Sequence, residues 1–513
     1  MVKQIKRRAQ ITKLVQIFSF VLALCFVWLV THILVNGGWY YYGYNEVTLL
    51  ACIALALAVL LCAWWLIKRY EATLEKHARL ITITFLAVMA VLQMVLGWQL
   101  RYKPVFDIDA IFGGASEWVE TGTFASYYDY YYTFPNNYGG LRFMYWVLSV
   151  AHALGLRDYY FAAMAANCAL SILTMYATGQ AAKHLLGVRG QIMAYVLFAV
   201  SPPFYFIAPA FYTDALSMPF PILTYWFYLL AKKQSRLWKR LSLYALMGVC
   251  TSLGAQIKAT VVIMLIAILI DGILTLGWKR TTAMGLVATV MLLLGQAGLE
   301  HTIYQHLDRA EAQQKSTPLL HWVMMGLTGI GMYNNQDYTF TESFTDREEQ
   351  SVALKAEIKR RIQDLGPEGL VSLLTTKGNI IFGDGTYGLS DCLGGEPLRE
   401  TGLREWLLSG GEHNKAYRHI CTGILLALYI FMILSGLWDA FSPDDNVFQA
   451  LVPRLAVFGL MLFLLCWEAR WRYFSNYIPL IFLSSLPGID QLMERLRHVQ
   501  AGNKKCVSPC LAP

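Results

Sequence analysis

Charged residues are scarce in this chain of 513 residues: Asp, Glu, Lys and Arg make up 15% of it, whereas hydrophobic residues make up 56%. Soluble domains carry roughly a quarter charged residues, so this composition excludes an ordinary soluble enzyme. The ten cysteines form no CxxC or Cys/His spacing, which indicates neither a metal site nor a disulfide framework. No internal repeat relates the two halves of the chain, in contrast to many secondary transporters.

Long apolar runs are the main feature of the sequence. Stretches of roughly 17 to 25 residues with few charges, the length that a helix needs to cross a bilayer, recur along the chain. We therefore predict an all-α polytopic membrane protein with about twelve transmembrane helices. The expected spans are 15–36, 46–67, 80–100, 158–181, 190–208, 215–231, 241–257, 259–277, 281–299, 419–438, 449–467 and 472–488. A further run, 141–155, is too short to cross and is predicted to lie at the membrane surface.

Basic residues outnumber acidic ones, 42 to 34, and they concentrate in alternate loops. Lys and Arg are retained on the cytoplasmic side, so KQIKRRAQITK at 3–13 and KKQSRLWKR at 232–240 place both termini in the cytoplasm. The net charge of +8 then reflects topology in the plasma membrane, and a nucleic-acid partner is not expected.

The predicted spans divide the chain into five parts. These are a two-span extension (1–79), a transmembrane core (80–300) with a first outer loop (101–157), an extracytoplasmic loop domain between spans 9 and 10 (301–417), C-terminal transmembrane helices (418–490) and a cytoplasmic tail (491–513). In the large loop, TDREEQSVALKAEIKRRIQDLGPEG predicts a helix that begins with a capping box of Thr345 and Glu348 and stops at Gly366. EGLVSLLTTKGNIIF predicts a second, amphipathic helix on the membrane surface.

Ionisable residues gather at the outer ends of different predicted spans. Asp107 and Asp109 follow the third span, and the others are Asp214 in FYTD, Lys258 in IKAT, and Arg470 and Arg472 in EARWRYFSNYIP. A single carboxylate there would be a solvated residue at a helix start. Several acids and cations on one membrane face can instead bind an anionic headgroup and deprotonate a hydroxyl.

Each of the other candidate site residues has two interpretations from the sequence, one structural and one functional. The tyrosines around 127–132 belong to an interfacial aromatic belt, or one or two of them stack on a sugar. Asn136 and Asn137 either cap the surface helix that begins near Gly139 or bind a substrate. His321, Asp337 and Asp384 in the large loop either complete a substrate pocket or only fold the loop.

The order of these motifs resembles the GT-C superfamily of membrane glycosyltransferases. Together with the acidic pair, FPNN at 134–137, HWVMMGL at 321–327, KGNIIFGDGTY at 377–387 and EARWRYFSNYIP at 468–479 are similar to one branch of it. This branch contains the protein O-mannosyltransferases and the lipid A aminoarabinose transferase, and within it the motifs resemble a group of membrane proteins common in Gram-positive bacteria. The resemblance covers residues 80–490.

This resemblance implies transfer of a sugar from a polyprenyl-phosphate-linked donor to a hydroxyl on the extracytoplasmic face, with inversion. The acceptor would be a cell-surface glycopolymer, a glycolipid or a protein. It also implies that Asp107 is the general base with Asp109 beside it, and it leaves open whether a divalent metal such as Mg or Mn binds these two acids.

The remaining expected roles are contacts to the donor phosphate and to the substrates. Arg470, Arg472, Tyr473 and Lys258 are expected to hold the donor phosphate. Substrate contacts are expected from Asp214, Asn136, Asn137, His321, Asp337 and Asp384. A transporter or lipid flippase, and a surface polysaccharide polymerase or ligase, remain as alternatives. A transporter would be expected to carry ionisable residues at mid-depth rather than at the outer span ends.

Overall fold

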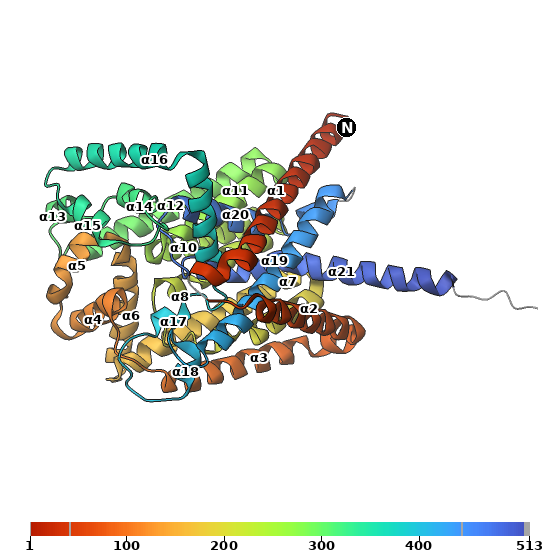
Figure 1. Ribbon diagram of the computed structural model, residues 1–513, viewed down its shortest axis with the longest axis horizontal. Helices are drawn as coiled ribbons and strands as arrows, with labels where there is room; N and C mark the ends of the chain where they lie inside the picture. The colour runs from red at the N-terminus through yellow and green to blue at the C-terminus, as the bar shows by residue number, and fades with distance from the viewer. Residues whose placement is uncertain (1, 41–42, 443–444, 507–513) are drawn as a thin grey trace, which may run out of the picture.

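The computed structural model describes residues 2–40, 43–442 and 445–506. Within these ranges the chain is helical and contains no strand beyond an isolated bridge between Tyr102 and Pro397. The predicted all-α class is confirmed for this part of the chain. The helices of the apolar bundle are α1 (Val2–Tyr40), α2 (Glu46–Arg69), α3 (Glu71–Gln99), α7 (Tyr159–Val200), α9 (Pro219–Lys232), α10 (Leu237–Ile257), α11 (Val262–Thr275), α12 (Trp278–Ile303), α19 (Asn414–Phe441), α20 (Leu451–Cys466) and α21 (Ile478–Cys506) (Figure 1).

Six helices among the described residues are long and apolar enough to cross a membrane. They are Arg8–Asn36, Glu46–Arg69, Glu71–Gln99, Tyr159–Val200, Trp278–Ile303 and Asn414–Phe441. Two shorter apolar helices, Ala259–Thr275 and Leu451–Cys466, coincide with two further predicted spans. The predicted spans 215–231, 241–257 and 472–488 fall on α9, α10 and α21, which do not meet this length and composition. The structure therefore supports a polytopic membrane protein, while the number twelve stays a prediction.

Helix α7 contains two predicted spans in one continuous segment. Its backbone leaves helical geometry at Leu186 and Gly187, where Gly187 has a φ of 66°. A Cβ on Gly179 would lie 2.5 Å from the Tyr195 ring. In a straight helix these residues would be about 24 Å apart, so the two halves of α7 form a hairpin. The second half ends at Val200, short of the predicted 208, because Pro202 and Pro203 follow.

Residues predicted on the same side of the membrane contact one another. On the predicted cytoplasmic side, the ion pairs are Glu71 with Arg189 (3.1 Å) and Lys68 with Asp490 (2.6 Å), and the cytoplasmic Lys232 pairs with Asp271 near the end of the predicted span 259–277 (2.9 Å). On the other side, Arg101 lies 3.9 Å from Asp158. Residues that were predicted to share a side of the membrane thus lie at the same end of the bundle.

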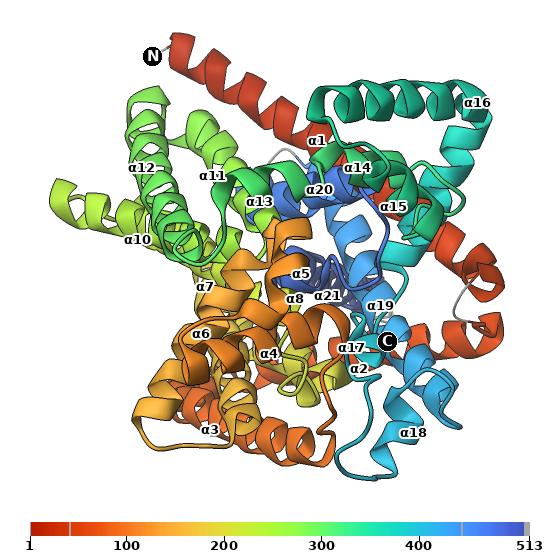
Figure 2. The same ribbon diagram turned by 90° about the vertical axis from the view of Figure 1, so that its left-hand side faces the viewer.

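The helices outside the apolar bundle gather at one end of it (Figures 1 and 2). They are α4 (Phe106–Thr121), α5 (Tyr128–Thr133), α6 (Tyr138–Ala153), α8 (Thr213–Ser217), α13 (Arg309–Lys315), α14 (Leu319–Met325), α15 (Asn335–Glu342), α16 (Arg347–Phe382), α17 (Leu389–Cys392) and α18 (Leu403–Leu407). The first outer loop and the large loop pack together, since the Thr317 amide donates to Thr133 O (2.9 Å) and the Asp308 amide to the Tyr132 hydroxyl (3.1 Å). The predicted surface helix 141–155 corresponds to α6.

Helix α16 bends sharply, and Figure 1 shows its two segments meeting at an angle. The break lies at Gly366, whose φ of 58° suits glycine, and the predicted stop there is confirmed. The predicted capping box is wrong by one residue. Asp346, not Thr345, is the N-cap, and its side chain accepts a hydrogen bond from the Glu349 amide at 2.8 Å. Aspartate is a better N-cap than threonine, which explains the shift.

The ion pair of Arg454 with Asp439 lies inside the bundle, between α19 and α20. Arg454, in the first turn of α20, is 1% exposed and donates to Asp439 (2.5 Å) and to the Ser435 hydroxyl (2.7 Å). Gln491 of α21 donates to the other carboxylate oxygen of Asp439 at 3.1 Å. Because both charged residues sit near helix ends and satisfy each other, the pair ties α19, α20 and α21 together.

We expect Arg454→Ala to lower the free energy of unfolding by about 3 kcal/mol, because it leaves the Asp439 carboxylate buried without its cation. Thermal unfolding of the purified protein in detergent would measure the loss as a lower Tm. The control is the double variant Asp439→Leu with Arg454→Met, which removes both charges and should recover most of the stability. Equal Tm values for Arg454→Ala and the wild type would contradict this role.

Candidate functional site

Asp107 is held by two phenols at the start of α4. Its Oδ1 accepts a hydrogen bond from the Tyr130 hydroxyl (2.8 Å) and its Oδ2 one from the Tyr212 hydroxyl (2.9 Å), while the side chain stays 42% exposed. Burial, and then the negative charge of Asp107, raise the pKa of both phenols well above the ordinary value. Both tyrosines therefore remain protonated donors at working pH. Their hydrogen bonds fix the orientation of a carboxylate that solvent can reach.

The residue before Asp107 is strained. Phe106 has a φ of 52°, which is rare for a residue with a side chain, and it is 89% exposed. Such strain persists only where the surrounding structure imposes it, and it is concentrated at functional sites.

Asp109 faces another way, as its spacing from Asp107 along a helix predicts. Its Oδ2 accepts a hydrogen bond from the Tyr127 hydroxyl at 3.2 Å. Burial, with a further contribution from Asp109, raises the pKa of Tyr127 to about 12. Nowhere in the described ranges do three or more His, Cys, Asp or Glu residues form a group that could hold a metal ion. Asp107 and Asp109 instead bind different tyrosines, Tyr130 and Tyr127.

Asp214, Lys258 and Arg472 meet beside Asp107. Asp214 lies in α8 and is 5% exposed, and Lys258, which directly follows α10, donates to its Oδ1. The Nε of Arg472 lies 3.5 Å from Asp214 Oδ2, and one Nη lies 3.9 Å from Asp107 Oδ2. Burial lowers the pKa of Lys258, and the Asp214 carboxylate opposes this shift. Four segments far apart in the sequence thus bring two acids and two cations together, as the sequence predicted.

Aromatic rings support the two cations. The Lys258 ammonium lies 4.7 Å from the centroid of the Tyr473 ring, and the Arg472 guanidinium lies 4.7 Å from that of Tyr212. Cations over ring faces are stabilised by the ring quadrupole. Tyr473, predicted as a phosphate ligand, therefore positions Lys258 in this structure.

Arg470 has a partner that the sequence analysis did not single out. Glu468 is 2% exposed and accepts hydrogen bonds from Arg470 Nε (3.0 Å) and from the Tyr473 hydroxyl (3.1 Å). The Arg470 side chain remains 30% exposed. The motif EARWRYFSNYIP includes Glu468, but no sequence pattern indicated that its carboxylate accepts a hydrogen bond from Arg470.

A loop segment covers Arg472. A Cβ on Gly388, which has a φ of 73°, would lie 2.5 Å from the Arg472 Cβ, so the backbone approaches as closely as only glycine permits. Between this segment and the charged cluster lies a cavity of about 30 Å³, lined in part by Tyr212, Asp214, Tyr387 and Arg472.

Asp384 shapes the covering segment instead of facing the cavity. It is 1% exposed and accepts hydrogen bonds from the Thr386 amide (3.0 Å), the Thr386 hydroxyl (2.7 Å) and the Gly388 amide (3.2 Å), with Arg418 at 3.5 Å. Its predicted substrate contact does not fit this position. Of the two interpretations, loop folding describes what the carboxylate does here.

Asp391, which the sequence analysis missed, lies in the same segment. Desolvation by the surrounding segments, and then the Asp384 carboxylate, raise the pKa of Asp391 to about 6, although the residue itself keeps an exposed face. Arg418, Arg472 and Arg470 act in the opposite direction. No local motif marked this acid, because its neighbours come from distant parts of the chain.

His321 and Asp337 also serve the loop. Asp337 accepts both Nη groups of Arg361 (2.7 and 2.8 Å) and a hydrogen bond from Asn334. His321 is fully buried, its Nδ1 pairs with the Thr341 hydroxyl (2.6 Å), and burial lowers its pKa to about 4. These contacts lie within the large loop, so the structure does not bring either residue to the Asp107 cluster.

Asn137 belongs to the Asp107 network, and the predicted capping role is wrong. Helix α6 begins at Tyr138 without a side-chain cap. The Asn137 amide is buried and donates to the Tyr130 hydroxyl (2.5 Å), which donates to Asp107. Asn136 is exposed. A turn of 3₁₀ helix at Pro135–Asn137 directs the second asparagine inward. The neighbouring tyrosines likewise serve loop packing and the acids, not a belt alone.

Comparisons with known proteins give a family but no assigned activity. No curated protein matches the sequence. A search of solved structures finds the crystal structure of ArnT from Cupriavidus metallidurans bound to undecaprenyl phosphate, at 12% identity and a TM-score of 0.36, covering 80% of this chain and 77% of that chain. A TM-score this low does not establish a common fold. A family model described as conserved hypothetical integral membrane protein matches residues 5–490, and the chain therefore belongs to that family of integral membrane proteins.

Proposed function

We propose that this protein is a membrane glycosyltransferase of the GT-C kind, which transfers a sugar from a polyprenyl-phosphate-linked donor to a hydroxyl acceptor. The observation that carries the proposal is the placement of Asp107, an accessible carboxylate, 3.9 Å from Arg472 within a cluster that also holds Lys258. A base next to partly buried cations is what the transfer of a group from a phosphate leaving group to a hydroxyl requires.

In the proposed reaction, Asp107 accepts the proton of the acceptor hydroxyl as its oxygen attacks the anomeric carbon. The bond from that carbon to the phosphate oxygen breaks on the opposite face, so the configuration inverts. The lipid phosphate leaves with the bonding electron pair, and Arg472, Lys258 and Arg470 stabilise its charge. Tyr130 and Tyr212 orient the base through the hydrogen bonds at 2.8 and 2.9 Å.

The carboxylates that already pair with these cations do not exclude this role. Asp214 and Glu468 fix the positions of Lys258, Arg472 and Arg470 before the donor arrives. Prior orientation lowers the reorganisation that binding requires. The guanidinium of each arginine has further N–H groups with which to bind a phosphate.

A genetic comparison tests the proposal. The glycans of the wall and membrane of a deletion strain are compared with those of its parent by mass and sugar composition. The proposal expects one sugar substituent to disappear, and to return with the wild-type gene but not with Asp107→Asn. Unchanged glycans, or full restoration by Asp107→Asn, would contradict it. A transporter or flippase would show instead an accumulated, intact substrate, and a polymerase or ligase a change in polymer length.

We expect the site to face the outside of the cell, and matched cysteine substitutions check this. Ser343→Cys, in the loop between α15 and α16, should react with an impermeant thiol reagent on intact cells. Ser235→Cys, between α9 and α10, should not. Both serines are exposed, so reagent access depends on the membrane side alone. The exposed Cys62 and Cys466 are first replaced by serine. The reverse labelling pattern would place the site in the cytoplasm and exclude the proposed donor orientation.

A further inference from the structure

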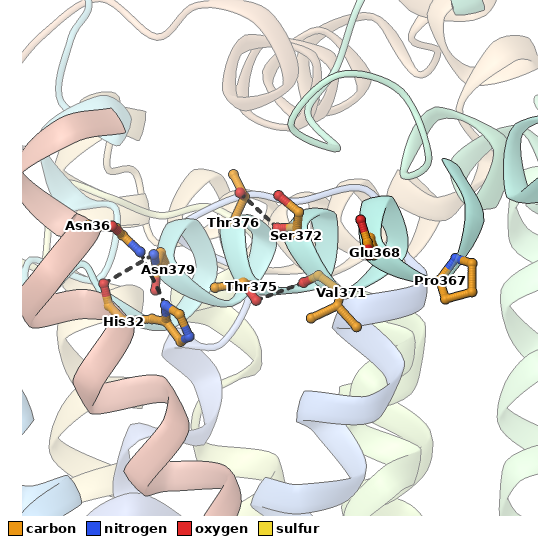
Figure 3. Close-up of a pocket in the computed structure, with 9 residues that line it drawn as sticks. All are labelled: His32, Asn36, Pro367, Glu368, Val371, Ser372, Thr375, Thr376 and Asn379. Carbon is orange, nitrogen blue, oxygen red and sulfur yellow. Dashed lines mark hydrogen bonds between the residues drawn. The ribbon is translucent and has the colours of Figure 1, made fainter. Parts of the chain in front are cut away.

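A groove lies between α1 and the second segment of α16, with a volume of about 560 Å³ (Figure 3). The described residues that line it are His32, Asn36, Pro367, Glu368, Val371, Ser372, Thr375, Thr376 and Asn379. The α16 residues recur at helical spacing and share one face. Lys377, on another face of the same segment, donates to Gly326 O at 2.9 Å. The groove is therefore separate from the Asp107 cluster.

The polar atoms of this groove include several hydrogen-bond acceptors. The Thr375 and Thr376 hydroxyls donate to carbonyl oxygens of their own helix at 2.7 and 3.0 Å, which leaves their oxygens as acceptors. Asn379 is 6% exposed, and its Oδ1 is buried with no hydrogen-bond partner in the described part of the chain. Buried amide oxygens are nearly always satisfied. An unsatisfied one in the wall of a groove indicates a ligand that donates hydrogen bonds.

The charges of the lining residues narrow the class of ligand further. No Lys or Arg occurs among the described residues of the lining, so nothing there neutralises a phosphate. The single carboxylate, Glu368, is exposed at one end, which does not favour a buried ammonium group. A ligand with many hydroxyl donors and no charge suits this surface.

The α1 wall indicates where such a ligand comes from. His32 and Asn36 share a helix face with Trp28 and Val35, which are 36% and 60% exposed, at the end of an apolar helix long enough to cross a membrane. Trp28 contacts His32 edge to face, with ring centroids 5.4 Å apart. An apolar helix surface that leads into a polar groove accommodates a lipid chain below a polar headgroup.

We propose that this groove binds the uncharged sugar headgroup of a membrane glycolipid, with the lipid chains along α1. The proposal does not depend on the glycosyltransferase reaction, because no residue of the described groove lining belongs to the Asp107 cluster. It gives the N-terminal extension a function that the catalytic cluster does not require.

Binding of lipid to the purified full-length protein in nanodiscs tests the proposal. The probes are a diglucosyl diacylglycerol, phosphatidylethanolamine and phosphatidylglycerol, each in an otherwise phosphatidylcholine bilayer, and retention is measured by native mass spectrometry. We expect the glycolipid to be retained preferentially, and the double variant Thr375→Val with Thr376→Val to reduce its retention at least about fivefold. The control is Thr302→Val, because Thr302 on α12 makes the same hydrogen bond to its own helix, to Gly298 O at 2.8 Å.

Each outcome bears on the proposal. Retention of the glycolipid that the double variant abolishes and Thr302→Val preserves supports it. Equal retention of the three lipids, or retention unchanged in a double variant of normal Tm, would overturn it. Soluble disaccharide that displaces the glycolipid at similar concentration would show that the groove takes free sugar and that the lipid chains add nothing.

Discussion

Replacing Asp107 with asparagine should cut single-turnover sugar transfer by about 100- to 10,000-fold, the usual contribution of a general base. Asparagine keeps the shape of the side chain and one acceptor for the two phenols that hold Asp107, so folding and donor binding should remain nearly intact. Rapid-quench measurement of one turnover, with enzyme in excess of labelled donor, separates this loss from slow product release.

Asp109→Asn is the matched control, because it removes an identical charge two residues away. It should reduce turnover much less, since Asp109 binds Tyr127 and faces another direction. Repeating both measurements with a chelator tests whether the pair shares a metal. Normal turnover in Asp107→Asn would leave Asp214 or Asp109 as the candidate base.

The second large effect concerns Arg472. Arg472→Gln should weaken binding of the polyprenyl-phosphate donor about tenfold to a hundredfold, as expected for the loss of a charge-assisted contact to an anion. The loss also leaves Asp214 with Lys258 as its only cation partner in the described structure, so turnover should fall with affinity. Equilibrium binding of labelled donor to the variant in nanodiscs measures the effect.

Arg470→Gln provides the comparison for that measurement. Arg470 is more exposed than Arg472 and is held by Glu468, so the same substitution should weaken donor binding less. If both variants bind donor as the wild type does, the arginines are not the phosphate ligands, and Lys258 becomes the principal candidate.

The sequence allowed the helices and the sorting of their ends to be predicted, because both follow from local composition. Apolar runs of sufficient length mark helices, and glycine followed by proline marked the bend of α16. The meeting of Asp107, Asp214, Lys258 and Arg472 was also predictable, because residues at outer span ends share a thin layer of space. The number of membrane crossings was not predictable, because several helices are too short or too polar for their composition to show whether they span the membrane.

The partners of each charge could not be predicted from the sequence. Glu468 pairs with Arg470 two residues away, and Asn137 reaches Asp107 only through Tyr130. Such contacts depend on how the side chains pack in the folded chain, which no local pattern encodes. For the same reason the candidates His321, from the motif HWVMMGL, and Asp337 turned out to hold the large loop together.

The segment around Gly388 determines how the donor reaches its cations. A cavity of about 30 Å³ accommodates a single water molecule, which is far smaller than a phosphate with a sugar attached. The donor phosphate therefore has no room on the side of the Gly388 segment. The side chains of Asp107 and Arg472 are 42% and 18% exposed, so in the proposed reaction the donor reaches the cations from the Asp107 side. The Gly388 segment is then the back wall of the proposed site.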